Sequence, residues 1–156
     1  MNILFVCTGN TCRSPMAAAI MDKLAVDNGL DVRIESAGIF AADGEPASEE
    51  AVEALKKYDI DLSEHRSQQI TPELIEKSDI IITMTEAHKM ILQDVAAEKT
   101  VTICELAEMD DEIEDPFGGD LEDYTKTADK LYIALTQIVD KLSEIQENQN
   151  EDKKDE

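Results

Sequence analysis

Basic residues are scarce in this chain. Of its 156 residues, 14 are lysine or arginine and 36 are aspartate or glutamate, so the formal net charge is −22. Nucleic-acid backbones and anionic membrane surfaces repel such a protein, which argues against both as partners. Most of this charge is interpreted as a solvated surface. Any anion that the protein binds must therefore meet a local positive site.

Long hydrophobic runs, cysteines and histidines are scarce too. No apolar run approaches the roughly 20 residues that cross a membrane, and the first residues lack the basic start of a secretory signal. Three cysteines, an odd number, do not suggest a disulfide framework in a chain of this length. No cysteine or histidine spacing resembles a zinc site, so we expect no metal and no cofactor. A reducing cytoplasm fits these features best.

Short apolar segments alternate with segments of helical periodicity. This order is typical of a single α/β domain with a four-stranded parallel sheet and helices on both faces. The expected strands are residues 2–6, 31–36, 80–84 and 100–103, and the expected helices are 14–28, 47–58, 71–77, 86–95 and 121–146. Residues 147–156, which follow the last expected helix, contain no apolar side chain. We therefore predict a domain over 1–146 and an acidic disordered tail over 147–156.

The segment after the first expected strand carries the strongest chemical signal. It reads Cys7-Thr8-Gly9-Asn10-Thr11-Cys12-Arg13-Ser14. A loop that joins a parallel strand to a helix N-terminus points backbone N–H groups into one concavity, which binds an anion. These groups and Arg13 favour the nucleophilic thiolate of Cys7, and Arg13 can hold two phosphate oxygens. The segment predicts phosphoryl transfer to sulfur, with a buried structural cysteine before an ordinary turn as the alternative.

A general acid is expected in a second loop, which follows the fourth expected strand. Cleavage of a phosphate ester or amide needs a proton for the leaving group, and a nearby carboxylic acid is its usual source. Asp115 is the only acidic residue followed by a proline, an aromatic residue and paired glycines. The proline favours an extended Asp115, whose carboxylate can project from the loop. The alternative is an ordinary turn before the last helix.

Together, these two segments resemble the low-molecular-weight protein phosphatase family, in which a loop of Cys, five residues, Arg and Ser or Thr precedes an Asp-Pro loop. The resemblance runs from the first strand through the last helix. It implies that Cys7 becomes a phosphocysteine while Arg13 and the loop N–H groups hold the phosphoryl group. It further implies that Ser14 donates to the Cys7 sulfur, and that Asp115 acts first as general acid and then as general base.

The resemblance also implies supporting and substrate-binding residues. Asn10 resembles the asparagine that holds the family's loop in a strained shape, and Ser36 and His65 resemble its partners. An exposed or capping histidine is the alternative for His65. The other expected substrate-binding residues are Thr8, Gly9, Thr11, Cys12, Phe40 and Phe117. For Phe40, a loop residue that covers the edge of the core is an equal alternative.

The remaining cysteines bear on redox chemistry. In the family, the cysteine that matches Cys12 can form a disulfide with the nucleophile Cys7 and shield it from over-oxidation, whereas a packing role is the alternative. Related arsenate reductases coupled to thioredoxin use further cysteines beyond the loop. Only Cys104 lies beyond it here, so arsenate reduction is disfavoured.

Two departures from the family's tyrosine-specific pattern concern the substrate. Tyrosine phosphatases of the family usually have a large aliphatic residue in place of Thr11, and an aromatic pair where Phe117 is followed by glycine. Both features resemble the protein-arginine phosphatase branch, in which the loop threonine and the aspartate engage the guanidinium. The resemblance implies hydrolysis of phosphoarginine in proteins, with phosphotyrosine as the alternative. A non-enzymatic redox or oxyanion sensor is a third reading, but a sensor needs no general acid. The oligomeric state stays open.

Overall fold

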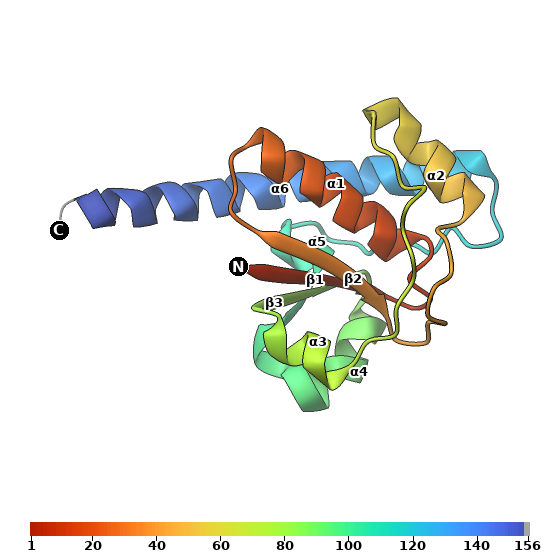
Figure 1. Ribbon diagram of the computed structural model, residues 1–156, viewed down its shortest axis with the longest axis horizontal. Helices are drawn as coiled ribbons and strands as arrows, with labels where there is room; N and C mark the ends of the chain where they lie inside the picture. The colour runs from red at the N-terminus through yellow and green to blue at the C-terminus, as the bar shows by residue number, and fades with distance from the viewer. Residues whose placement is uncertain (155–156) are drawn as a thin grey trace.

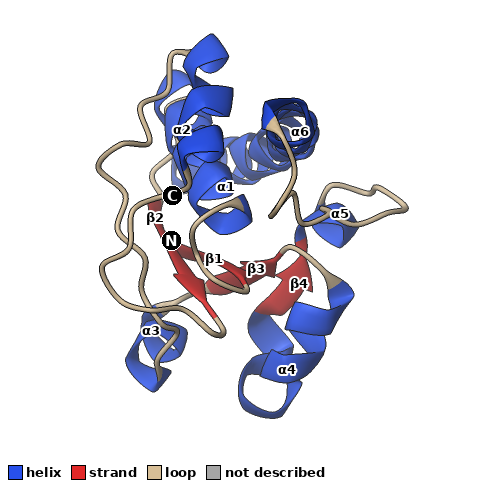
Figure 2. Cartoon of the chain, turned by 90° about the vertical axis from the view of Figure 1, so that its right-hand side faces the viewer, coloured by secondary structure: helices blue, strands red, loops and turns tan. Residues whose placement is uncertain are grey.

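The computed structural model describes residues 1–154, which form one parallel sheet with helices on both faces (Figures 1 and 2). The strand order is β2-β1-β3-β4. The strands are β1 (Asn2–Cys7), β2 (Arg33–Gly38), β3 (Ile80–Thr83) and β4 (Thr100–Thr102). The predicted α/β sheet architecture is therefore confirmed. None of the described helices combines the length and the hydropathy needed to cross a membrane.

The helices divide between the two faces of the sheet. Figure 2 shows α1 and α6 over one face, with α2 beside them, and α3 and α4 over the other. The α-helices are α1 (Arg13–Asp27), α2 (Glu49–Leu55), α3 (Pro72–Lys77), α4 (Glu86–Ala96), α5 (Ile103–Leu106) and α6 (Leu121–Lys154), and two short 3₁₀ turns are η1 (Lys56–Tyr58) and η2 (Ala97–Lys99).

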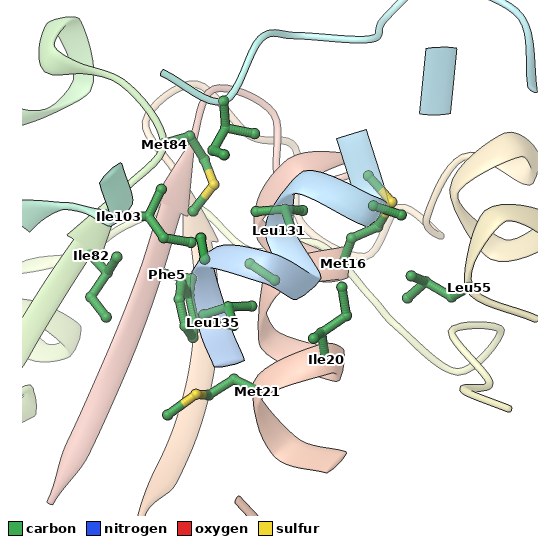
Figure 3. Close-up of a cluster of buried hydrophobic side chains, with 14 of the residues drawn as sticks. Phe5, Met16, Ile20, Met21, Leu55, Ile82, Met84, Ile103, Leu131 and Leu135 are labelled. Atoms are coloured by element: carbon green, nitrogen blue, oxygen red, sulfur yellow. The ribbon is translucent and has the colours of Figure 1, made fainter. Parts of the chain in front are cut away.

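The alternation of side chains along β1 places the nucleophile candidate. Successive residues of a strand point to opposite faces, so Ile3 and Phe5 pack in the larger core cluster, and Leu4 and Val6 pack in the smaller one. Cys7 continues the first series and lies on the α1 side of the sheet. Figure 3 shows the larger cluster, in which Phe5, Met16, Ile20, Leu131 and Leu135 meet between the sheet, α1 and α6.

The bounds of β2 differ from the expected 31–36, because pairing with β1 decides them. Asn2 of β1 pairs with Arg33, and Cys7 pairs with Gly38. The strand is thus shifted toward its carboxyl end, and Gly38 comes to lie beside the residue that ends β1.

The last helix also differs from the expectation. α6 continues to Lys154, whereas the sequence predicts disorder from residue 147. Extending an existing helix avoids the unfavourable nucleation step, and glutamate, glutamine and lysine have good helix propensity, so this segment stays helical without apolar contacts. Residues 155 and 156 of the predicted tail lie outside the described residues.

Candidate active site

The segment from Cys7 to Ser14 surrounds a cavity at the carboxyl end of β1. The cavity has a volume of about 230 Å³. Its lining residues are Cys7, Thr8, Gly9, Thr11, Cys12, Arg13, Asp115 and Phe117. The two loops singled out in the sequence therefore face the same cavity, although about a hundred residues separate them. Among residues 1–154, no three histidine, cysteine or carboxylate side chains converge as metal ligands.

The sulfur of Cys7 lies 2.9 Å from the hydroxyl oxygen of Ser14. Asn10 Nδ2 donates to the same hydroxyl oxygen at 2.8 Å, so the proton of Ser14 is free to point at the sulfur. Ser14 is completely buried in the first turn of α1. A hydroxyl donor in this position would stabilise negative charge on the sulfur.

Asn10 holds the loop in its unusual shape. Its φ angle is 58°, in the left-handed region that asparagine tolerates better than most residues. Its amide donates to Ser36 Oγ at 2.9 Å and accepts the Gln68 backbone N–H at 3.0 Å. The Asn10 carbonyl lies 2.7 Å from Nε2 of His65, and burial lowers the pKa of this histidine. Ser36 and His65 thus lie where the resemblance implies, whereas Gln68 was not expected.

Gly38 permits the close approach of β2 to this loop. A Cβ atom on Gly38 would lie 2.5 Å from the Thr8 carbonyl oxygen and 3.0 Å from the Asn10 nitrogen. The first distance is too short for any side chain. Only the pairing of β2 with β1, which sets Gly38 beside Cys7, places this glycine next to the loop, so the sequence analysis did not select it.

Arg13 connects the loop from Cys7 to Ser14, which we call the phosphate loop, to the loop that holds Asp115. Arg13 is only 5% exposed, and its Nη1 donates to the Ile113 carbonyl at 3.1 Å. Its Nη2 lies 3.5 Å from Asp115 Oδ2, while Oδ1 of the same carboxylate accepts the Phe117 N–H at 3.1 Å. A guanidinium has five N–H donors, so Arg13 keeps donors for oxygens in the cavity. Asp115 remains half exposed at the cavity, where a leaving group can reach it.

Cys12 lies in the same cavity lining as Cys7 and contacts α6. Its sulfur is 3.4 Å from the Tyr124 hydroxyl and 3.7 Å from Ser48 Oγ. Burial, helped by the hydrogen bond with Cys12, raises the pKa of Tyr124 to about 12. Tyr124 was not expected at the site, since only the packing of α6 against α1 brings it there.

The two aromatic residues expected as pocket walls differ in their placement. Phe117 is 79% exposed and lines the cavity, where a leaving group could cover it. Phe40 is 78% exposed, and its side chain does not line the cavity. Its backbone N–H instead donates to the Thr8 carbonyl at 2.9 Å. Phe40 is therefore a neighbour of the loop through its backbone, and the expected wall is absent from this cavity.

A buried histidine that the sequence analysis did not select also contacts the loop. His88 Nε2 lies 3.0 Å from Thr8 Oγ1, and Nδ1 lies 3.1 Å from Thr85 Oγ1. His88 is in the first turn of α4, which directly follows β3, and β3 is paired with β1. Because the carboxyl ends of adjacent parallel strands meet at one edge, this position could have been expected near the loop.

Known proteins are similar to this chain in sequence and in fold. The family model described as low molecular weight phosphotyrosine protein phosphatase matches residues 2–150. The protein-arginine-phosphatase of Bacillus subtilis is 41% identical over 146 residues, which cover 91% of this chain and 97% of that protein. The low molecular weight protein-tyrosine-phosphatase PtpB of Staphylococcus epidermidis is 38% identical over 144 residues, covering 91% and 96%.

Solved structures agree with the sequence matches. The YwlE arginine phosphatase from Geobacillus stearothermophilus superimposes with a TM-score of 0.87 at 39% identity, covering 94% of this chain and 96% of that one. The family model spans both the loop that holds Cys7 and the loop that holds Asp115. The resemblance inferred from these two loops thus extends to almost the whole chain, which belongs to the low-molecular-weight protein phosphatase family of cysteine-dependent enzymes.

Proposed function

We propose that this protein hydrolyses phosphoarginine in phosphorylated proteins. The observation that carries this proposal is that two residues with hydrogen-bond acceptors, Thr11 and Asp115, line the cavity beside the nucleophile, together with a single aromatic residue, Phe117. A guanidinium leaving group is rich in N–H donors and needs acceptors of this kind. Relatives that are 41% and 42% identical are named protein-arginine-phosphatases, which supports the same substrate class.

The reaction would proceed in two steps through a phosphocysteine. The Cys7 thiolate attacks phosphorus while Arg13 and the loop N–H groups hold the phosphoryl oxygens. Asp115 gives its proton to the departing guanidinium nitrogen. In the second step, the Asp115 carboxylate takes a proton from water, which attacks the phosphocysteine. The Ser14 hydroxyl, 2.9 Å from the sulfur, then stabilises the departing thiolate.

The overall charge also favours a cationic leaving group. A protein with a net charge of −22 repels anions, and phosphotyrosine offers no positive charge to offset this. The guanidinium of the substrate supplies one. We place the reaction in the reducing cytoplasm, where the free cysteines Cys7, Cys12 and Cys104 persist.

Thr11→Ile should change the preference between the two substrate classes. The substitution removes a hydroxyl that can pair with the guanidinium and adds apolar bulk that suits a phenyl ring. The Thr11 backbone carbonyl, which accepts the Ser48 N–H at 3.0 Å, is unaffected. We expect kcat/KM to fall for phosphoarginine peptides and to rise for phosphotyrosine peptides. The swing should exceed the roughly 10–200-fold that one methylene group produces.

The measurement compares both peptides with wild type and variant in one assay. If both activities fall together, Thr11 is a residue of loop stability and does not select the substrate. If wild type itself prefers phosphotyrosine, the arginine assignment is overturned and the tyrosine phosphatase alternative takes its place.

We also propose that Cys12 protects Cys7 during oxidation. Peroxide converts the Cys7 thiolate to a sulfenic acid, and the Cys12 thiolate then displaces hydroxide to form a disulfide. Both side chains line one cavity, which supports this pairing. Mild peroxide should inactivate wild type reversibly, with activity restored by thiol. In Cys12→Ser, the loss should become irreversible. Unchanged recovery in that variant assigns Cys12 to packing against Tyr124.

A further inference from the structure

His88 is a buried titratable group that the two-step reaction does not use. It is 7% exposed and does not line the cavity. Both of its ring nitrogens are within hydrogen-bond distance of threonine hydroxyls, one of which belongs to Thr8 in the phosphate loop. Thr8 is itself exposed and lines the cavity together with Thr11, Asp115 and Phe117. His88 therefore contacts Thr8, a side chain that a leaving group in the cavity can touch.

The surroundings of His88 keep its ring neutral. Burial is the main cause that lowers its pKa to about 4, and the positive charge of Arg13 adds to this effect. The carboxylates of Asp115 and Glu112 act in the opposite direction but do not overcome it. At neutral pH the ring then carries one proton, so one nitrogen donates and the other accepts.

The contacts of Thr85 allow a consistent assignment of that proton. Thr85 Oγ1 accepts the backbone N–H of His88 at 3.3 Å, as the N-cap of α4, and lies 3.1 Å from Nδ1. A hydroxyl oxygen has two lone pairs, so it can accept from Nδ1–H as well. Nε2 is then the acceptor, 3.0 Å from Thr8 Oγ1, and the Thr8 proton points toward the histidine and away from the cavity.

We propose that Thr8, oriented by His88, is a second residue that selects the leaving group. His88 Nε2 accepts the Thr8 hydroxyl proton, so the lone pairs of Thr8 Oγ1 point toward the N–H groups of the leaving group. Thr8 is the specificity-determining residue, and His88 is a positioning residue that acts through it. The inference rests on the proposed phosphoarginine substrate. It gives the leaving-group pocket an acceptor on the β3 side, in addition to Thr11 and Asp115.

The first test compares Thr8→Val with Thr8→Ser. Valine keeps the shape of threonine but removes the acceptor, whereas serine keeps the hydroxyl. A hydrogen bond to a charged group contributes roughly 10- to 100-fold, so Thr8→Val should lower the ratio of phosphoarginine to phosphotyrosine kcat/KM by about that factor. Thr8→Ser should keep the ratio within about threefold of wild type. Thr136→Val, on the exposed side of α6, is the matched control and should leave both activities unchanged.

The second test uses two amides of different reach at position 88. His88→Gln places an acceptor where Nε2 stands, so it should retain the substrate ratio. His88→Asn carries the same group one methylene shorter, so it should lose the ratio as Thr8→Val does. The double variant Thr8→Val/His88→Asn should lose no more than either single variant, since both break one interaction. Thermal unfolding of each variant shows whether the ratio changes independently of stability.

Nuclear magnetic resonance can determine which ring nitrogen of His88 carries the proton, and a purely structural role for His88 does not require one particular tautomer. A long-range ¹H–¹⁵N spectrum of His88 should show Nδ1 protonated and Nε2 unprotonated at neutral pH. A proton on Nε2 would turn the Thr8 proton into the cavity and overturn the assignment.

The outcomes separate this inference from the function on which it rests. If wild type prefers phosphoarginine and Thr8→Val leaves the ratio within about threefold, the inference is overturned and the function stands. Equal losses on both substrates in His88→Gln and His88→Asn, parallel to lower stability, also overturn it, because His88 is then structural only. If wild type prefers phosphotyrosine, the proposed function and the inference that rests on it are both overturned.

Discussion

Cys7→Ser should lose turnover by several orders of magnitude while the phosphate loop keeps its shape. A serine hydroxyl in this site stays protonated, so the loop N–H groups and Arg13 have no anionic nucleophile to stabilise. The side chain of Asn10 holds the loop through hydrogen bonds to Ser14, Ser36 and the Gln68 N–H, and none of these bonds involves the Cys7 sulfur. Phosphate binding, read as a rise in melting temperature with added phosphate, should therefore survive.

The matched control for this variant is Cys104→Ser. Cys104 is a buried free thiol in α5, its pKa is raised by burial, and its sulfur lies 3.9 Å from Asp111 Oδ1, away from the cavity. The same atomic change there should leave turnover unaltered. Retention of more than about a tenth of the wild-type rate by Cys7→Ser would contradict the covalent mechanism, because loss of an essential nucleophile is far more severe.

Asp115→Asn should have the second largest effect, and its size should depend on the leaving group. General acid catalysis contributes roughly 10²- to 10⁴-fold, and an activated aryl phosphate needs little of it. We expect a loss in this range on phosphoarginine peptides and a much smaller loss on an activated aryl phosphate. The asparagine Oδ1 can still accept the Phe117 N–H, so the turn that carries the side chain should persist.

Glu114→Gln is the control for Asp115→Asn. Glu114 is the exposed neighbour of Asp115 and does not line the cavity at Cys7, so this variant tests whether any nearby carboxylate can act as the acid. The rate on both substrates should stay close to that of wild type. Equal losses in Asp115→Asn on the two substrates would assign Asp115 a positioning role through Arg13, whose Nη2 lies 3.5 Å away.

The loop that holds the candidate nucleophile and the succession of strands and helices along the chain could be predicted from local sequence. Cys7, Arg13 and Ser14 lie in one short segment, and a strand followed by a polar loop and a helix needs no distant contact to be recognised. Asp115 was selected by its immediate neighbours and by its place after the fourth strand. These features were predictable because backbone conformations and capping preferences depend on residues close in the chain.

The length of local elements was less predictable. The helix α5 has only four residues, too few for a periodic pattern, and η1 replaces the last turn of the helix expected over 47–58. The carboxyl end of α6 has no apolar stripe from which a helix could be predicted. Where apolar contacts do not specify an element, its ends are decided by the balance between helix propagation and solvation, which composition does not reveal.

The residues of the loop from Cys7 to Ser14 could therefore be selected from the sequence, whereas the surroundings of this loop were decided by the tertiary structure. His88, Tyr124 and Gly38 touch the loop because the strand order β2-β1-β3-β4 and the packing of α6 on α1 bring them there. The backbone N–H of Phe40 also reaches the loop through a contact that the sequence pattern did not reveal, its hydrogen bond to the Thr8 carbonyl. Contacts between residues distant in the chain depend on sheet order and helix packing, which are cooperative properties of the whole fold and leave no mark in a local pattern.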